Sequence, residues 1–357
     1  MGVLFGGRSG EHAVSLMSAR SVLAALDPAR FEAVPLGIDR QGRWLLPDDA
    51  QRALESGPEA VPGRPVALRP GPGGALVTAD GARSPAVDVV FPVLHGPNGE
   101  DGTIQGLLQL CALPYVGTGV LGSALGMDKI MQKDVFVRHG LPTPDYVGVS
   151  RADWRADPEA VAARVVAAVG LPCFVKPANL GSSVGISRAG DPAQLRAALD
   201  LAARHDRRLI CERAVTGCRE VECGVLGNDH PRASVPGEVV PYAVFYDYDS
   251  KYSEGGADLV VPADLPPALA ARIQTLALRA FAALDCAGMA RVDFFVRTAP
   301  DEVLVNEVNT IPGFTERSMY PRLWAASGLP YPELLAQLVY LALERHADGA
   351  AEEEERT

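Results

Sequence analysis

The chain has 357 residues, 48% of them hydrophobic, and this length predicts two or three domains with substantial cores. A formal net charge of -11 argues against nucleic acid or an anionic membrane as a partner, because both repel an acidic protein. No apolar run is long enough to span a membrane, and the six cysteines lack the spacing of a zinc site, so we expect a soluble, cytoplasmic protein with free thiols.

The first predicted unit is an α/β domain. Its predicted elements in chain order are a strand at 3–5, a glycine-rich turn at 6–10, a helix at 11–26, hairpins or loops at 57–86 and a buried strand at 88–94. The last strand delivers His95 and the polar segment up to Gly102 at its carboxyl end. Open α/β sheets bind ligands at that edge, which makes this segment a candidate site.

Two further units are predicted after the first. The second starts near residue 127, with a helix to 139, strands at 146–149, 173–176 and 208–212, and helices from 158 and over 192–204. The third starts near 218 and is mostly strands, with a long helix at 266–284 and a closing helix at 332–345. The acidic run Glu352 to Glu355 at the end of the chain predicts a disordered tail.

Two strand-like segments of the third unit carry a cluster of polar residues. At a period of two residues, Arg291 and Asp293 share one face of the first segment, and Glu307 and Asn309 share one face of the second. Carboxylate and amide oxygens are the ligands that Mg2+ uses beside a nucleotide, and an arginine suits charge that develops on phosphate. The alternative is an edge hairpin whose polar face meets only water.

Glycine-rich segments and scarce lysines indicate phosphate binding. The segment 176–185, KPANLGSSVG, follows a strand and can present backbone N–H groups to phosphate oxygens, although such a segment is also typical of a plain turn. It lacks the Walker spacing, and the glycines at 6–10 lack the GxGxxG spacing, so a P-loop ATPase and a dehydrogenase are both disfavoured. Few lysines stand among many arginines, and they are Lys129, Lys133, Lys176 and Lys251.

An aromatic and polar segment, FYDYDSKY at 245–252, lies between two strand-like segments. This composition predicts a mobile lid over a site, and the alternative is a surface loop with packed tyrosines.

Taken in order, the motifs resemble those of the D-alanine:D-alanine ligases of the ATP-grasp superfamily. They are VLFGGRSGEHAVSL at 3–16, VLHGPNGEDGTIQG at 93–106, GMDK at 126–129, KPANLGSSVGIS at 176–187, FYDYDSKY at 245–252, GMARVDF at 288–294 and EVNTIPGFTERSMYP at 307–321. They are collinear and span nearly the whole chain.

The resemblance implies an α/β (α+β) protein with a three-domain ATP-grasp architecture and an N-terminal parallel-sheet domain. The implied boundaries are 1–126 for the N-terminal substrate-side domain, 127–217 for the central subdomain, 218–348 for the C-terminal subdomain and 349–357 for the disordered tail. It also implies ATP as a substrate, two Mg2+ or Mn2+ ions, D-alanine as the other substrate, and a homodimer, which is also the commonest soluble oligomer.

The resemblance assigns residues to ATP and metal. Lys129 and Lys176 would neutralise phosphates, and Glu212 and Glu220 would reach adenine and ribose. The full ATP-binding set is Lys129, Lys176, Glu212, Arg213, Glu220 and Lys251, and the metal ligands are Asp293, Glu307 and Asn309. Arg213 stands where the family usually has lysine, and the alignment around 216–220 is open by one residue.

It also assigns residues to the amino acid substrates and the reaction. Glu11 would pair with the ammonium of the first D-alanine, with His95 close by, and Ser318 with the Met319 backbone would hold the carboxylate of the second. Arg291 and the Gly313 N–H would form an oxyanion hole. The implied catalytic set is Glu11, Ser182, Tyr252, Arg291 and Gly313.

The implied chemistry has two steps, because a carboxylate at neutral pH does not acylate an amine. The first D-alanine attacks the γ-phosphorus of ATP to give an acyl phosphate, and the amine of the second D-alanine then displaces phosphate. Three alternatives stay open: a ligase that joins D-alanine to D-lactate or D-serine, an ATP-grasp ligase for other amino acids, and a regulatory nucleotide-binding protein without catalysis. Met319 disfavours the D-lactate ligase. The resemblance places an arginine at this position in D-lactate ligases, where its positive charge would disfavour an incoming ammonium and suit a hydroxy acid.

Overall fold

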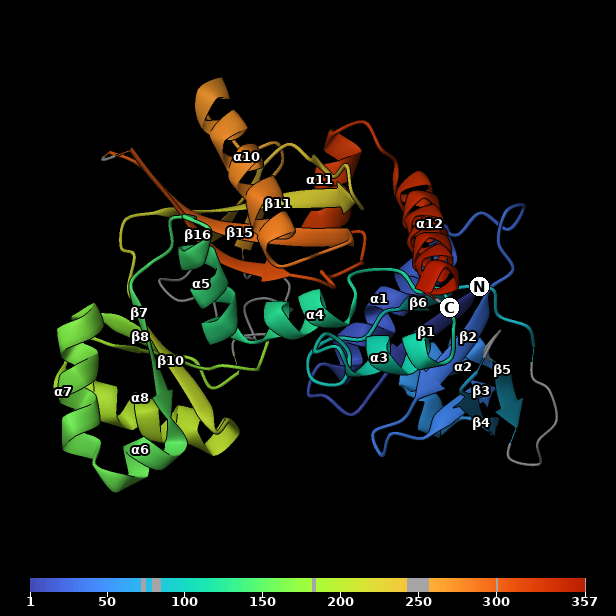
Figure 1. Cartoon of the computed structure of the whole chain (residues 1–357), viewed down its shortest axis with the longest axis horizontal. Helices are drawn as coiled ribbons and strands as arrows, with labels where there is room; N and C mark the ends of the chain where they lie inside the picture. Colours follow the sequence, from blue (N-terminus) through green and yellow to red (C-terminus); the bar gives the residue numbers. More distant parts are fainter. Residues whose placement is uncertain (72–74, 79–84, 182–183, 243–256, 300, 357) are drawn as a thin grey trace.

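Three β-sheets form the framework of the molecule, which Figure 1 shows as a computed structural model. The structure describes the chain except residues 72–74, 79–84, 182–183, 243–256, 300 and 357, and it also leaves out the side chains of 352–356. The mixed α/β class agrees with the prediction.

The N-terminal sheet has the strand order β5-β4-β3-β2-β1-β6. Its strands are β1 (Gly2–Gly6), β2 (Val34–Ile38), β3 (Trp44–Pro47), β4 (Gly63–Arg69), β5 (Ala75–Thr78) and β6 (Val90–Pro92). The three strands β2, β1 and β6 are parallel, as predicted, and the other three extend the sheet in antiparallel fashion. The loops that follow β1 and β6 therefore start side by side, at the carboxyl ends of two neighbouring parallel strands.

Short helices surround this sheet. They are α1 (His12–Ala25), α2 (Ala50–Ser56), the 3-10 helix η1 (Pro58–Ala60), α3 (Thr103–Leu110) and α4 (Val120–Met127). Helix α1 packs on β1 through residues that include Leu16, Ala19 and Val22, which recur at helical spacing and are all buried. Glu11 stands at the position just before this helix, and its place is fixed by that packing.

The central sheet has the order β7-β10-β8-β9. Its elements are β7 (Tyr146–Ser150), α6 (Arg151–Ala156), α7 (Pro158–Val169), β8 (Cys173–Pro177), β9 (Ser187–Ala189), α8 (Pro192–His205) and β10 (Arg208–Arg213). Asp157 and Asp191 each accept a backbone N–H at a helix start and each is followed by proline, which is a strong start signal in the sequence. Both helices bury an apolar face against the sheet.

The C-terminal sheet has the order β14-β13-β11-β15-β16, with β12 paired to β11. Its elements are β11 (Arg219–Gly227), β12 (Arg232–Ala233), β13 (Gly237–Pro241), β14 (Ala257–Val260), α10 (Pro267–Ala283), β15 (Gly288–Thr298), β16 (Asp301–Asn309) and α11 (Met319–Ala326). Helix α5 (Lys129–Arg138) packs here too, because Phe136 lies in the same core as Ile273 and Phe281. Ile130 at its start meets Ile210 of the central sheet, so α5 joins the two sheets.

The last helix, α12 (Tyr331–Arg356), returns to the N-terminal domain, where it packs against α1 (Figure 1). It differs from the prediction at its end, because the helix continues to Arg356 where the acidic run predicted a disordered tail. Alanine, glutamate and arginine are good helix formers, and extending an existing helix avoids the cost of nucleation. Among the described residues, no helix has the length and apolar character to cross a membrane.

Candidate functional site

The polar face predicted on two strands of the third unit is present on β15 and β16. The strands are antiparallel, and their register pairs Asp293 with Glu307 and Arg291 with Asn309. The amide nitrogen of Asn309 donates to Asp293 Oδ2 at 3.0 Å. The ladder shifts by one residue after Asp293 and then continues, so the regular pairing is interrupted beside the cluster. The structure therefore brings these four residues together on one face.

Arg291 is held by two carboxylates. Its Nε donates to Asp293 Oδ1 at 2.7 Å and lies 2.8 Å from Glu222 Oε2, while Nη2 donates to Asp293 Oδ2 at 2.8 Å. Burial lowers the pKa of Arg291, but Asp293 and Glu222 outweigh it and hold that pKa well above its usual value. The guanidinium is therefore a permanent positive charge beside the oxygen donors.

Glu222 is a member of the site that the sequence reasoning missed. It lies on β11, directly opposite Asp293 in the register of β11 with β15. The alternation of Glu220 and Glu222 along a strand was a usable signal, because both must point to one face.

The donor set on β15 and β16 fits a hard divalent cation, because carboxylate and amide oxygens are what Mg2+ and Mn2+ accept. Within the described part of the chain, no three His, Cys, Asp or Glu side chains group closely enough to hold a metal alone. The amide of Asn309 lies beside these carboxylates, so its oxygen could serve as a further donor to a cation.

A buried ion network lies on the neighbouring central sheet. Both oxygens of Glu212 are paired, Oε1 with Lys133 Nζ at 3.0 Å and Oε2 with Lys176 Nζ. Burial raises the pKa of Glu212, but Lys133 and Lys176 outweigh it and bring that pKa to about 2. Glu212 is therefore a carboxylate that holds Lys176, and its oxygens are turned to lysines and not outward.

Lys133 was noted in the sequence as one of few lysines but was given no role. Its Nζ also donates to Thr143 Oγ1 and to the carbonyl of Asn306, both at 3.0 Å. Asn306 precedes Glu307 on β16, so this one ammonium connects the central sheet to the strand that carries the metal candidates. Helical spacing alone did not show that Lys133 faces inward.

Replacing Lys133 by methionine is expected to lower the free energy of unfolding by about 3–5 kcal/mol, because a buried carboxylate loses one of two partners. Urea unfolding measures the loss. The control is Arg213→Met, which breaks a partly exposed pair with Asp145 of 3.0 Å and should cost less than about 1 kcal/mol. The double change Lys133→Met with Glu212→Gln should recover part of the loss. Equal stability of Lys133→Met and wild type would contradict the network.

The remaining predicted phosphate-side residues are placed as follows. Lys129 starts helix α5, donates to the Leu180 carbonyl at 2.9 Å and lies 3.5 Å from Glu307. Arg213 pairs with Asp145 at the sheet edge, away from Glu212's buried partners. Glu220 lies on β11 and raises the pKa of Lys176, together with Glu212 and Glu307 and against burial. Lys251, Tyr252 and Ser182 lie outside the described residues.

A second cluster lies where the N-terminal domain meets the end of β16. Glu11 is buried, and a Cβ at Gly96 would lie within contact of Glu11 Oε2 and displace that carboxylate, while the positive φ of 73° at Gly96 also favours glycine. His95 is buried with Nε2 3.2 Å from Ser18 Oγ. Burial lowers the pKa of His95, and the opposing effect of Glu11 is smaller.

Glu100 is a third member of this cluster and was also missed. It accepts a hydrogen bond of 2.6 Å from the Gly96 N–H. Burial and Glu11 raise the pKa of Glu100 to about 8, although Gly96 and Lys129 act in the other direction. Two carboxyl groups in one partly buried place favour a ligand that brings an ammonium. The motif at 93–106 contained Glu100, but the sequence did not show which of its acids faces inward.

This cluster predicts a pH dependence. The folded pKa of Glu100, about 8, lies above its ordinary value of 4.5, so the wild type loses stability as pH rises through that window. Glu100→Gln does not titrate, so its advantage in free energy of unfolding should grow from about pH 4.5 to 8 and then level off, reaching about 1–2 kcal/mol after allowance for partial exposure. Urea unfolding at a series of pH values tests this. A difference that does not vary with pH would contradict it.

The turn after β16 joins the two clusters. The backbone of Ile311 lies beside both His95 and Glu100, where it raises the pKa of His95 and lowers that of Glu100, and the Phe314 N–H approaches Ser18 Oγ at 3.5 Å. Ser318 Oγ accepts from the Thr315 N–H at 3.0 Å and would lie 2.9 Å from a Cβ at Gly313, so Gly313 and Ser318 are neighbours. The side chain of Met319 is buried in an apolar cluster, which leaves its backbone for contact with a ligand.

Comparisons with known proteins show which family this chain is similar to. Family models described as "D-ala D-ala ligase N-terminus" and "D-ala D-ala ligase C-terminus" match residues 1–118 and 135–340. The D-alanine--D-alanine ligase of Deinococcus radiodurans is 54% identical over 344 residues, 96% of this chain and 98% of the relative.

Solved structures are similar over the same extent. The D-alanine-D-alanine ligase from Coxiella burnetii has a TM-score of 0.85 at 39% identity, covering 98% of this chain and 96% of that one. The VanG D-Ala:D-Ser ligase from Enterococcus faecalis also has a TM-score of 0.85, at 35% identity, covering 96% and 98%. The fold is thus shared by ligases whose names give different second substrates.

Proposed function

Since this chain belongs to the D-alanine–D-alanine ligase family, we propose that it joins two D-alanines to D-alanyl-D-alanine at the expense of ATP. It is an enzyme of the ligase class. The reaction takes place in the cytoplasm and supplies peptidoglycan precursor synthesis. The observation that carries the proposal is the turn after β16, which places the oxygen donors of β15 and β16 next to the carboxylates that suit an ammonium.

ATP binds between the central and C-terminal sheets. Lys129 and Lys176 neutralise its phosphates, with Lys176 oriented by Glu212, and Arg213, Glu220 and Lys251 complete the ATP-binding set. Asp293, Glu307 and Asn309 hold Mg2+ or Mn2+, two ions in all, which supply positive charge against the phosphate oxygens. Positive charge is needed because the attacking carboxylate and the γ-phosphate are both anions.

The amino acids bind at the second cluster. Glu11, with His95 close to it, receives the ammonium of the first D-alanine, whose carboxylate attacks the γ-phosphorus to form an acyl phosphate and ADP. Ser182 and Tyr252 connect the glycine-rich segment, the lid and Glu11 by hydrogen bonds. Ser318 and the Met319 backbone hold the second D-alanine, and its neutral amine attacks the acyl carbon. Arg291 and the Gly313 N–H receive the oxyanion, phosphate leaves, and Tyr252 closes the site against water.

The proposal is tested by incubating the protein with ATP, Mg2+ and D-alanine, alone or mixed with D-serine or D-lactate, while phosphate release and product masses are followed. Phosphate release coupled to D-alanyl-D-alanine, unchanged by the competitors, is the expected result. A product that contains D-serine or D-lactate would show that this protein has the second-substrate specificity of the D-serine or D-lactate ligases. ATP binding without turnover would favour a regulatory protein.

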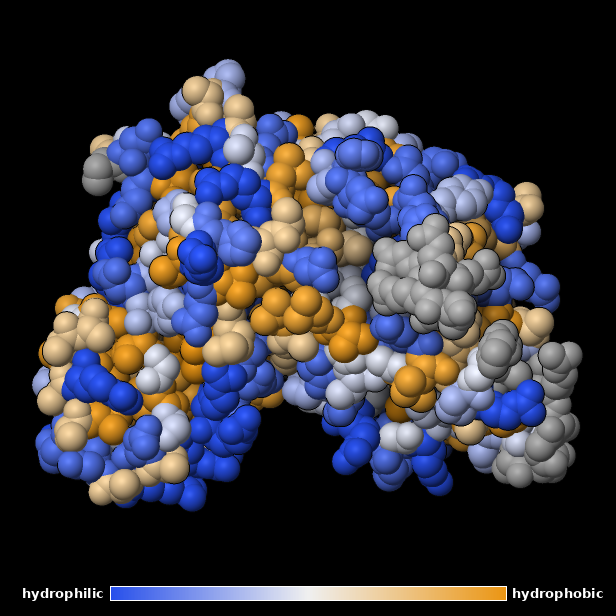
Figure 2. Space-filling view, in the orientation of Figure 1, coloured by the Kyte–Doolittle hydropathy of each residue, from blue (hydrophilic) through white to orange (hydrophobic). Residues whose placement is uncertain are grey.

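The enzyme is also proposed to be a homodimer, and an exposed apolar patch supports this. Leu110 at the end of α3 and Leu121 on α4 have exposed fractions of 72% and 58%. Figure 2 shows hydrophobic residues gathered at the centre of the face where Figure 1 places α4. A patch of this kind on neighbouring helices is typical of a contact between subunits.

Leu121→Glu is therefore expected to convert the dimer to a monomer, because it buries a charge in the contact. Light scattering after gel filtration measures the mass. Val137→Glu on α5 is the matched control, since Val137 is equally exposed at 57% but lies outside this patch. A monomeric wild type, or an effect of Val137→Glu alone, would refute the assignment.

A further inference from the structure

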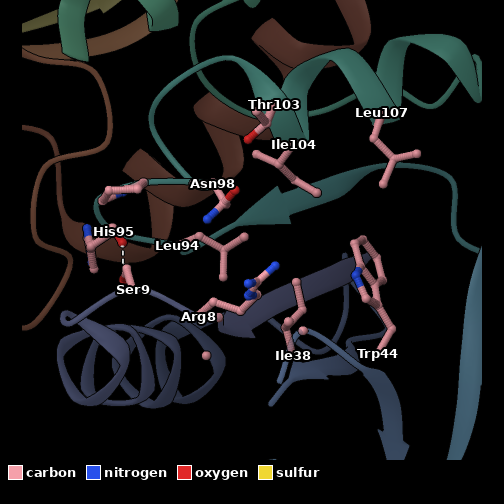
Figure 3. Close-up of a pocket in the computed structure, with 15 residues that line it drawn as sticks. Arg8, Ser9, Ile38, Trp44, Leu94, His95, Asn98, Thr103, Ile104 and Leu107 are labelled. Carbon is pink, nitrogen blue, oxygen red and sulfur yellow. Dashed lines mark hydrogen bonds between the residues drawn. The ribbon is translucent and has the colours of Figure 1, made fainter. Parts of the chain in front are cut away.

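A pocket of about 200 Å³ lies inside the N-terminal domain, beside the amino acid cluster, with which it shares His95 (Figure 3). It is formed by the loops that follow β1, β2 and β6, which are the parallel strands of this sheet. Loops at the carboxyl ends of parallel strands that leave toward opposite sides form the usual crevice for a ligand. Neither Glu11 nor any residue of the C-terminal sheet lines this pocket, and the proposed function leaves it unused.

The walls of the pocket are apolar. Ile38, Leu94, Ile104 and Leu107 surround the space, and Trp44 closes one side (Figure 3). Trp44 is half-buried, unlike the other two tryptophans, Trp154 and Trp324, whose exposed fractions are 4% and 1%. An aromatic wall of this kind offers stacking to a flat ligand.

One cation projects into this apolar space. The aliphatic part of Arg8 packs over Gly42, where any Cβ would lie 2.8 Å from Arg8 Cδ. The guanidinium of Arg8 points between Leu94 and Ile38 (Figure 3). The indole nitrogen of Trp44 faces the same space. Within the described ranges, no hydrogen bond or ion pair joins either side chain to another residue, so both keep their donors for a ligand.

Acidic groups near the rim are already engaged. Asp101 accepts hydrogen bonds from the backbone N–H of Asn98 and from the N–H and hydroxyl of Thr103. Asp39, at the base of the β2 loop, pairs with Arg43 at 2.6 Å. Arg8 therefore sets the charge that the pocket presents to a ligand.

We infer that this pocket binds an aromatic monocarboxylate, whose carboxylate meets Arg8 and the Trp44 N–H while its ring lies among Leu94, Ile104 and Leu107. The size agrees, because a cavity of about 150 Å³ holds benzene and this one has room for a ring with a short acid arm. Arginine binds carboxylates through paired N–H groups, and such bonds are stronger than neutral ones.

Binding is expected to affect the site of the first D-alanine, and this part of the inference rests on the proposed function. Ser9 and His95 line the pocket, and the Ser9 hydroxyl donates to the His95 carbonyl at 2.6 Å while accepting from the Glu11 N–H at 3.2 Å. A ligand that orders these two loops alters the placement of Glu11 and His95. The KM for the first D-alanine should then change severalfold with little change in the KM for ATP.

The binding test uses phenylacetate and follows tryptophan emission, without ATP or D-alanine, so it does not depend on ligase activity. A saturable change with a dissociation constant of about 1 mM or tighter is expected. Trp44→Phe should abolish the signal, since the other tryptophans are buried. Phenylacetamide, which keeps the ring and lacks the charge, and acetate, which keeps the charge and lacks the ring, should each bind roughly tenfold more weakly or worse.

The variant test is Arg8→Gln, expected to weaken phenylacetate roughly tenfold or more and to leave phenylacetamide unchanged. Arg40→Gln on the β2 loop is the matched control, because it removes the same charge from an arginine that does not line the pocket. No saturable change, equal binding of acid and amide, or equal effects of the two variants would overturn the inference. Binding with an unchanged KM for D-alanine would overturn the coupling, whereas inactivity without phenylacetate would count against the proposed function.

Discussion

Replacing Glu307 by glutamine is expected to reduce turnover about a thousandfold, because charge stabilisation by a bound metal is worth several kcal/mol and each 1.36 kcal/mol is tenfold in rate. Asp293→Asn should act alike, since the two residues are partners across β15 and β16. Both changes keep the shape of the side chain and remove the negative charge that a cation needs. Steady-state phosphate release with saturating ATP, D-alanine and Mg2+ measures the effect.

Glu302→Gln is the matched control for Glu307→Gln. Glu302 lies on the same strand and pairs with an arginine, Arg297, at 2.9 Å, but it stands away from the cluster. Its substitution should change turnover by less than about twofold, as expected for a partly exposed ion pair. Full activity of Glu307→Gln would remove this residue from the metal site. Recovery of activity at high Mn2+ would instead support weakened metal binding.

Replacing Arg291 by methionine is expected to lower kcat by about 10²–10³-fold, the usual cost of losing one oxyanion donor. Arg291 uses Nε and Nη2 for Asp293 and Glu222. Its third nitrogen, Nη1, is the atom that we expect to meet the oxyanion. Because the interaction forms in the transition state, kcat should fall far more than KM rises. Rates measured over a range of D-alanine and ATP concentrations separate the two effects.

A second role of Arg291 must be separated from catalysis, because its loss leaves Asp293 and Glu222 side by side without a counter-charge. The double variant Arg291→Met with Glu222→Gln removes the excess negative charge. If Arg291 acts on the oxyanion, the double variant stays as slow as the single one. Restored turnover would reduce Arg291 to a neutralising partner. Arg297→Met, on the same strand, is the control for removal of an arginine from β15.

Local patterns predicted much of the fold and the metal side of the site. The shared face of Arg291 and Asp293 and that of Glu307 and Asn309 followed from the two-residue period of strands, whereas the register that pairs Asp293 with Glu307 came from the structure. The helices predicted from Pro158 and over 192–204 are present as α7 and α8. The acidic tail was the local error, since a helix anchored by packing continued through it. The longer elements of the three units were therefore predicted, whereas shorter ones such as β2, β3, α3 and α4 were not, and the partners between elements were also missed.

The sequence by itself determined the longer elements, their order and the family, because residue periods and collinear motifs are local properties of the chain. Tertiary structure alone decided that Lys133 and Lys176 share Glu212, that Glu222 holds Arg291, and that Glu100 lies beside Glu11. These pairs come from different strands and helices. Their charges acquire shifted pKa values only when packing removes water and fixes the distance between them.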